Sequence, residues 1–308
     1  MGSRIAVIGS YAVGMTISTE RFPQEGETVK GKNFKAMHGG KGSNQAVAAS
    51  RMGAEVLYGG CVGNDSFGDG AIKLYEEEGI DSSYIIRSRE NQSTGVGLIY
   101  INAKGENEIV IDLAANFELS PADIDRMLPE ISKCKLLLMQ LEIHMDTVLY
   151  AAKKCKELGI PVVLNPAPYN QMPEELLKYC EFLVPNQTEA RAILGLDEDS
   201  SLSDEEVAKQ IHKLGVKNVI VTLGSEGALL VNDTMCKKIE GIPVNAIDTT
   251  GAGDTFNGSF CVALAEGHTI EDAIKFANIS AGLAVTKYGV IEGIPTREEV
   301  IKIAESNI

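Results

Sequence analysis

The chain reads NAIDTTGAGDTFNGSFCVALAEG over residues 245–267, and this stretch joins a glycine-rich turn to an apolar helical pattern. Gly251, Ala252 and Gly253 precede Asp254, and apolar residues follow at helical spacing. Small residues at a helix start leave consecutive backbone N–H groups free, and the helix dipole adds positive potential there. The stretch therefore predicts a helix N-terminus that binds an anion.

Asp254 admits two interpretations. Its carboxylate would lie beside an anion held by the turn, where a group that takes a proton from a hydroxyl attacking a phosphoryl group is needed. An aspartate at a helix start can also be an ordinary capping residue. The glycine-rich run, with Asp248 and two threonines before it, favours the functional interpretation.

A second glycine-rich turn precedes a helix expected at about 42–52. The sequence there is HGGKGSNQAVAASRMGA, over residues 38–54. Lys41 could reach a phosphate or a sugar hydroxyl, and Asn44 offers both a donor and an acceptor. A strand-to-helix turn with a solvated lysine would look the same, so both interpretations stay open.

Two further polar turns follow strand-like segments. In VPNQTEA, residues 184–190, Asn186 and Glu189 could address Mg²⁺ or its waters, although a plain helix start explains them nearly as well. In VTLGSEGAL, residues 221–229, three residues could lie along a nucleotide or simply form a β-turn. They are Thr222, Gly224 and Gly227.

The N-terminal turn, VIGSYAVGMTIS over residues 7–18, also contains glycines after a strand-like run. A Walker A motif needs a lysine after its last glycine, but Met15 and Thr16 follow Gly14. A dinucleotide fingerprint at the later turn is excluded because its sixth position is Phe256.

Strand-like runs alternate with amphipathic helical stretches along the chain, which predicts βαβ units on a parallel, doubly wound sheet. The runs are RIAVIG, AEVLYGG, KLLLMQ, IPVVLN, EFLVPN and KNVIVTLG. Two stretches, about 12–37 and 94–113, are rich in strand residues and contain no helical pattern. We expect them to form a small β-sheet lid on one domain that spans residues 1–308.

The composition excludes several classes. A formal net charge of −15 argues against nucleic-acid binding, and six scattered cysteines without a C-x-x-C pair indicate reduced thiols in the cytoplasm. The longest apolar run is too short to cross a membrane. The four histidines show no zinc-ligand spacing, and the sequence has no serine-hydrolase elbow.

Together the motifs resemble the ribokinase family of carbohydrate kinases. GGKGSNQAVAA and DTTGAGDTFNG carry the resemblance, with LMQLE, LNPAP, PNQTEA and TLGSEG in the same order between them, so that it covers about residues 4–300. It implies a three-layer α/β/α fold with a mainly parallel central sheet and a β-sheet lid. It also implies transfer of the γ-phosphate of ATP to a primary hydroxyl of a sugar.

By position, the resemblance implies roles for individual residues. Asp254 would be the catalytic base, and the N–H groups of Gly251, Ala252 and Gly253 would form an anion hole. The sugar would be held by Gly39, Gly40, Lys41, Asn44, Glu142 and Asp254. The nucleotide would be lined by Asn186, Thr222, Gly224, Gly227, Gly253 and Asn278.

The resemblance also implies Mg²⁺, a monovalent cation and a partner. Glu189 would place Mg²⁺ through water. K⁺ would be bound largely by backbone carbonyls of Asp248, Thr250, Ala284, Lys287, Gly289 and Gly293. Family members pair through their lids, so a homodimer is expected.

One turn departs from the ribose-specific members of the family. They have Gly-Ser-x-Asn-x-Asp, whereas this chain has GSYAVG, with Ala12 and Gly14 in place of the asparagine and the aspartate. Neither side chain can grip a hydroxyl. We expect an ATP-dependent kinase of a ribose-like pentose. The alternatives are a kinase of a deoxy sugar, another pentose, a hexose or a nucleoside, or a sensor without catalysis.

Overall fold

A computed structural model of the protein describes residues 3–169 and 171–306. Its main sheet has nine strands in the order β13-β12-β11-β10-β9-β8-β1-β4-β5. In this sheet, neighbouring strands are parallel all the way from β11 across β1 to β5. The strands β12 and β13 add an antiparallel edge beside β11. Their bounds are β1 Arg4–Ile8, β4 Glu55–Val62, β5 Asp81–Arg87, β8 Leu137–Met139, β9 Val162–Leu164, β10 Phe182–Leu183, β11 Asn218–Thr222, β12 Ala228–Asn232 and β13 Cys236–Ile239.

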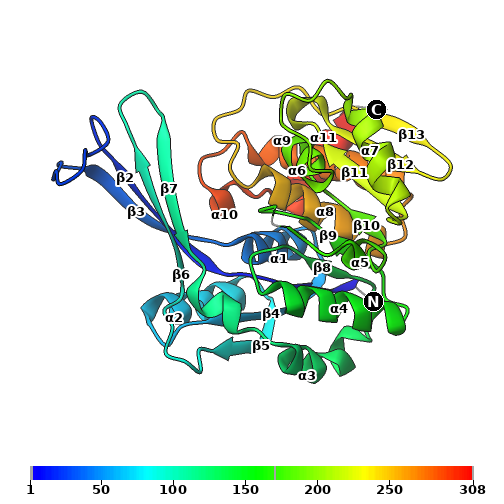
Figure 1. Ribbon diagram of the computed structural model, residues 1–308, viewed down its shortest axis with the longest axis horizontal. Coiled ribbons are helices and arrows are strands. Elements are labelled where there is room, and N and C mark those ends of the chain that lie inside the picture. The colour runs from blue at the N-terminus through cyan, green and yellow to red at the C-terminus, as the bar shows by residue number, and fades with distance from the viewer. Residues whose placement is uncertain (1–2, 170, 307–308) are drawn as a thin grey trace.

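Helices cover both faces of this sheet (Figure 1). One face carries α1 Lys41–Arg51, α2 Ser66–Glu77, α8 Ala252–Ala265, α9 Ile270–Ala284, α10 Val290–Gly293 and α11 Arg297–Ser306. The other carries α3 Pro121–Ile131, α4 Met145–Glu157, α5 Glu174–Leu177, α6 Gln187–Ile193 and α7 Asp204–Lys213. The expected three-layer α/β/α fold is confirmed.

Strand β1 shows why its run is apolar throughout. Ile5 and Val7 belong to the core on one side of the sheet, whereas Ala6 and Ile8 belong to the core on the other. Successive side chains of a strand point to opposite faces, so a strand covered on both faces must be apolar at every position. The residues after such a strand emerge at the carboxyl edge of the sheet, where polar groups can meet.

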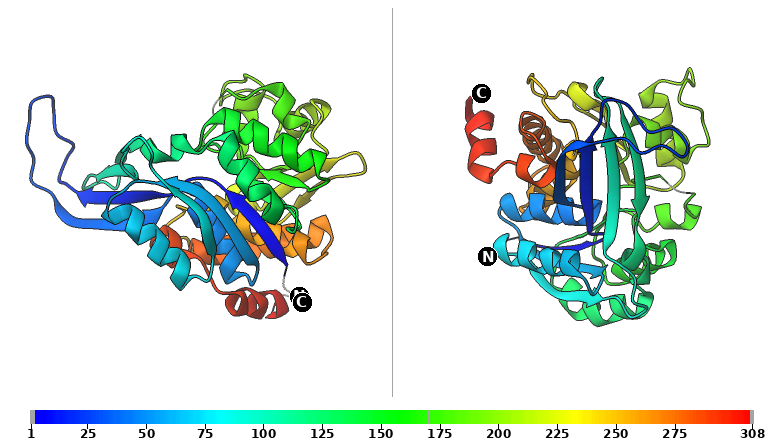
Figure 2. Two further views of the ribbon diagram at one scale, coloured as in Figure 1. Left: turned by 90° about the horizontal axis from the view of Figure 1, so that it is seen from below. Right: turned by 90° about the vertical axis from the view of Figure 1, so that its left-hand side faces the viewer.

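A separate four-stranded sheet projects from the main body (Figures 1 and 2), in the order β3-β2-β6-β7. Its strands are β2 Ala12–Ser18, β3 Lys32–Gly39, β6 Gly95–Ile101 and β7 Asn107–Asp112. They come from the two stretches expected to leave the main sheet, except that β3 continues to Gly39. We call this sheet the lid. Short 3₁₀ turns, η1 Ala114–Glu118 and η2 Gly224–Glu226, follow β7 and β11.

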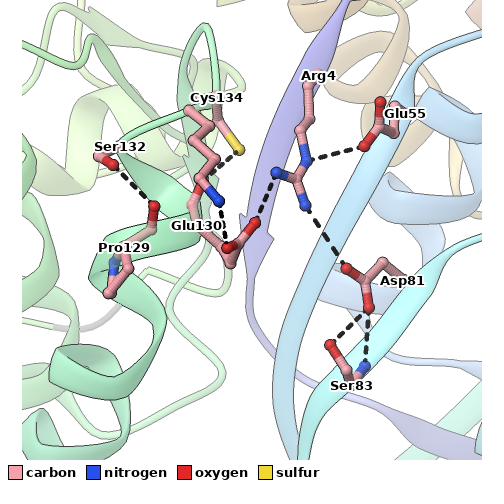
Figure 3. A network of polar contacts seen from close by, with 9 residues as sticks. Arg4, Glu55, Asp81, Ser83, Pro129, Glu130, Ser132 and Cys134 are labelled. Carbon is pink, nitrogen blue, oxygen red and sulfur yellow. Dashed lines mark hydrogen bonds and ion pairs between the residues drawn. The ribbon is translucent and has the colours of Figure 1, made fainter.

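Arg4 ties the opposite, amino-terminal ends of the strands together (Figure 3). Its guanidinium pairs with Glu55 at 3.0 Å, Glu130 at 2.8 Å and Asp81 at 3.6 Å, on β4, α3 and β5. Hydrogen bonds from Lys133 and Arg4 hold the pKa of Glu130 below its ordinary value. This cluster lies at the other edge of the sheet from the polar turns, so it is structural.

Candidate active site

The turn before α8 takes the shape that its glycines predict. Gly251 has φ of +79°, and a Cβ built there would lie 2.5 Å from Cγ1 of Val290. Only glycine adopts this backbone conformation at little cost in this crowded position. No side chain caps the N-terminus of α8 within the described residues, and the Ala252 N–H makes only a 3.3 Å bond to the Thr249 carbonyl. The N–H groups of this first turn therefore remain largely open to an anion.

Asp254 is not an ordinary capping residue. It lies inside α8, it is 7% exposed, and its carboxylate accepts hydrogen bonds from side chains of α1. Asn44 Nδ2 donates to Oδ2 at 2.8 Å, and Gln45 Nε2 donates to Oδ1 at 2.9 Å. The two glycine-rich turns, some 210 residues apart in the chain, thus meet at one carboxylate.

A second carboxylate, from Glu142, lies close to the start of α1. Glu142 Oε2 accepts from the Ser10 hydroxyl and from the Lys41 N–H, the latter at 2.8 Å. Burial raises the pKa of Glu142, although Lys41 and these hydrogen bonds oppose the shift. Ser10 comes directly from the N-terminal turn, so this turn contributes to the floor of the site.

Lys41 is the positive centre of the site. Burial lowers the pKa of its ammonium group, but the surrounding carboxylates outweigh burial and the net shift is upward. These carboxylates belong to Asp254, Glu142 and Glu189. A chain of net charge −15 thus places a half-buried cation where a phosphate would need it.

A cavity of about 170 Å³ lies between the α8 turn and Asp254. It is lined by Lys41, Asn165, Ala167, Val184, Asn186, Glu189, Thr222, Gly251, Gly253, Asp254 and Asn257. Asn186 caps α6 by accepting from the Glu189 N–H at 2.8 Å, and the Glu189 carboxylate accepts from the Asn186 N–H at 2.9 Å. The helix-start interpretation of this motif is correct. The Glu189 carboxylate also lines the cavity.

A groove of about 450 Å³ lies on the other side of the α8 turn. It contains most of the expected nucleotide residues, namely Thr222, Gly224, Gly227, Gly253 and Asn278. The side chain of Asn278 donates to the carbonyls of Ile239 and Glu240, at 3.0 and 3.1 Å, so it braces the wall of the groove. Asn186 lines the neighbouring cavity and not this groove.

Sequence reasoning missed the apolar wall of this groove. Ile242, Pro243, Val244, Phe256 and Val285 contribute to it. The segment that bears the first three, between β13 and α8, has no regular secondary structure and hence no periodic pattern to reveal it. An apolar wall of this kind suits an aromatic base.

The residues expected to hold a monovalent cation meet behind the α8 turn. Asp248 accepts from the N–H groups of Thr250 at 3.0 Å and Gly289 at 3.1 Å. Although burial opposes them, these bonds hold the pKa of Asp248 below its ordinary value. The Lys287 N–H donates to the Ala284 carbonyl and the Gly293 N–H donates to the Gly289 carbonyl, at 3.2 and 3.0 Å.

Side chains alone do not make a metal site here. The Lys287 ammonium group donates to Glu299 at 2.8 Å, so Lys287 could offer a cation only its backbone. Within residues 3–169 and 171–306, no three His, Cys, Asp or Glu side chains cluster as metal ligands do.

In the same ranges, no helix combines the length and apolar character that crossing a bilayer requires.

Known proteins match this chain over nearly its whole length. The family model for pfkB family carbohydrate kinases matches residues 3–297. Ribokinase of Haemophilus influenzae is 38% identical over 305 residues, which is 99% of each chain. Deoxyribokinase of Salmonella typhi is 38% identical over 296 residues, which is 96% of each chain. A structure of Arabidopsis thaliana ribokinase complexed with ribose and ATP has a TM-score of 0.91 at 32% identity, covering 98% of this chain and 99% of that one.

Proposed function

The chain belongs to the pfkB family of carbohydrate kinases and is an ATP-dependent sugar kinase, and we propose that its acceptor is the primary hydroxyl of a ribose-like pentose. The observation that carries the proposal is the meeting of Asp254, Asn44, Lys41 and Glu142 beside the α8 turn. These groups match the hydroxyls of a small polyol on one side and a phosphoryl group on the other.

In the proposed reaction Asp254 is the base. The sugar oxygen forms the new bond to the γ-phosphorus while the bond from that phosphorus to the bridging oxygen of ADP breaks. The hydroxyl proton passes to the Asp254 carboxylate as the new bond forms, because a sugar hydroxyl is too weakly acidic to lose it beforehand. The N–H groups of Gly251, Ala252 and Gly253 stabilise the charge on the transferring group, and Lys41 adds a positive charge.

Two cations fit the residues present. Glu189 Oε2 accepts from the Asn186 N–H, which leaves Oε1 to a water of Mg²⁺. Burial raises the pKa of Glu189, and a cation in the cavity would favour its charged form. Behind the α8 turn, the Asp248 carboxylate and the backbone carbonyls of the neighbouring loop suit K⁺. Mg²⁺ would neutralise phosphate charge, and K⁺ would fix the turn that carries Gly251.

The sugar itself is the finer part of the proposal. Ala12 and Gly14 alternate with Val13 along β2 and so lie on one face of the lid. Neither offers a hydrogen bond to a ring hydroxyl, whereas Glu142, Lys41 and Asn44 remain. This arrangement favours weak discrimination between ribose and 2-deoxyribose, and a deoxypentose is our second candidate substrate.

A substrate series tests the acceptor. We expect ATP consumption with pentoses, with kcat/KM for 2-deoxyribose within about tenfold of that for ribose, because only weak contacts to the 2-hydroxyl remain. Hexoses and nucleosides should be poorer. The measurement is a coupled ADP assay with Mg²⁺ and K⁺ present. Preference for a nucleoside would overturn the pentose, and silence with every acceptor would favour a sensor.

A gain-of-contact variant sharpens this test. A Cβ at Gly14 would have its nearest neighbours, Ile99 Cδ1 and the Met37 carbonyl, at 3.9 Å, so a side chain can begin there without a clash. The double variant Ala12→Asn/Gly14→Asp should favour ribose over 2-deoxyribose by a further tenfold or so, since a hydrogen bond to a charged group contributes about 1.5–3 kcal/mol. Gly14→Ala is the matched control. An unchanged ratio would remove Ala12 and Gly14 from the sugar pocket.

We further propose that two copies pair through their lids, in a reducing cytoplasm that suits the free cysteines. The lid exposes apolar side chains that a monomer would not need, including Ile109, Val110 and Ile111 at 52–63% exposure. Because they alternate along β7, apolar groups occur on both of its faces.

The double variant Val110→Asp/Ile111→Asp places a carboxylate on each face of β7. It is expected to convert a dimer to a monomer, since whichever face pairs would bury a carboxylate without a partner. Light scattering after size exclusion gives the mass. Leu158→Asp, which places the same charge on an exposed apolar residue of the body, should leave the dimer intact. A monomeric parent protein would contradict the pairing.

A further inference from the structure

We infer that three buried amide side chains, those of Gln45, Gln140 and Asn165, form a relay that orients the Asp254 carboxylate for proton transfer. The inference rests on the proposed role of Asp254 as the base. Gln45 touches that carboxylate, whereas Gln140 acts through Gln45. Both glutamines are fully buried, with no exposed surface.

The hydrogen bonds of Gln45 use its whole amide group. Its Nε2 donates to Asp254 Oδ1 at 2.9 Å and to Asn165 Oδ1 at 3.0 Å. Its Oε1 accepts from Gln140 Nε2 at 2.6 Å. A buried amide group that lost these partners would cost free energy, so the fold holds the Gln45 side chain in this orientation.

A backbone carbonyl fixes the direction of every bond in the relay. Asn165 Nδ2 donates to the carbonyl of Val184 at 2.9 Å, and a carbonyl can only accept. The oxygen of Asn165 therefore faces Gln45, so Gln45 must present its N–H₂ group there. Its oxygen is then left for Gln140. Gln45 is thus held with its donor, and not its acceptor, toward Asp254.

The relay completes a symmetric environment for the base. Gln45 donates to one carboxylate oxygen and Asn44 donates to the other, at 2.8 Å. Two donors on separate oxygens fix the plane of the carboxylate and still leave lone pairs for a substrate hydroxyl. The charged groups around it are Lys41 from α1, Glu142 after β8 and Glu189 from α6.

The far end of the relay rests on Gly9, directly after β1. Gln140 Oε1 has no hydrogen-bond partner among the described residues, and it lies where a side chain of residue 9 would begin. A Cβ built on Gly9 would be only 2.1 Å from this oxygen. Gly9 is therefore needed for close approach, because any larger residue would displace Gln140 and, through it, Gln45.

Two methionine variants test the relay. Gln45→Met and Gln140→Met keep the volume and remove the hydrogen bonds. For Gln45→Met we expect kcat to fall about 10–100-fold, the effect of losing one hydrogen bond to a charged group. The KM values for sugar and ATP should stay within about threefold. Gln140→Met should show the same changes at smaller size.

Val47→Ala is the matched control, because Val47 is fully buried on the same helix as Gln45 and its side chain forms no hydrogen bonds. It should lower the denaturation midpoint while leaving kcat and the KM values in place. If both methionine variants behave like Val47→Ala, the relay is wrong. Asp254→Asn distinguishes a failure of the relay from a failure of Asp254 as the proposed base. If it inactivates the enzyme while Gln45→Met does not, only the relay fails, and if it stays active, the base and the relay fail together.

Discussion

Replacing Asp254 with asparagine is expected to lower kcat by about 10²–10⁴-fold, the usual contribution of a general base. The amide cannot take the proton from the sugar hydroxyl, although it has nearly the same shape. The KM values should change little, because the proposed sugar contacts of Lys41, Glu142 and Asn44 remain. The measurement is steady-state ADP production at saturating sugar and ATP.

Two further variants make this result interpretable. In Asp254→Asn the new N–H₂ group would face one of the two donors, Asn44 or Gln45, so Asp254→Ala is a second variant without that repulsion. Asp272→Asn, in the first turn of α9 and remote from the site, is the matched control and should keep wild-type turnover. Turnover near that of the wild type in both variants at position 254 would refute the proposed mechanism.

Replacing Gly251 with alanine should have the second largest effect, a loss of about 10²–10³-fold in kcat, as when an anion-hole donor is removed. The new Cβ would lie 2.5 Å from Val290 in a backbone region that alanine avoids. The turn must shift, and its N–H groups then miss the transferring phosphoryl group. Single-turnover kinetics would show a slower chemical step, and binding of ADP by calorimetry would stay within a few-fold.

The Val290 side chain provides a control for this variant. Val290→Ala alone should be nearly silent in kcat, and the double variant Gly251→Ala/Val290→Ala should recover only part of the loss. The close contact is relieved in the double variant, but the positive φ remains costly for alanine. A single Gly251→Ala enzyme within threefold of the wild type would show that the turn does not bind the transferring group.

Much of the fold could be predicted because its signals are local. Apolar runs and amphipathic helices predicted the layers, and the expected helix at about 42–52 matches α1, Lys41–Arg51. Strand β13 was not predicted, because CKKI at the sheet edge is mostly exposed and lacks an apolar pattern. The parallel pairing of β2 with β6 could not be predicted either, since it joins strands about 80 residues apart.

The candidate site also has parts that the sequence predicts and parts that it does not. The proposed anion-binding turn follows from Gly251 to Gly253 themselves, whereas the proposed roles of Lys41 and Asn44 depended on the resemblance. The relay gave almost no local signal. Gln140 is a polar residue at the end of an apolar strand, and Gln45 lies 95 residues away in the chain. Only the packed structure brings such groups together.

The separation of the lid from the body has a consequence for how this enzyme can diverge. Ala12 and Gly14, which we propose bear on the choice of sugar, lie on a separate sheet, while the proposed base and anion hole belong to α8. Substitutions in the lid can therefore alter which sugar is accepted without dismantling phosphoryl transfer. A duplicated gene would keep a working catalyst while its substrate preference drifts, so new sugar kinases are accessible through few, individually tolerable steps.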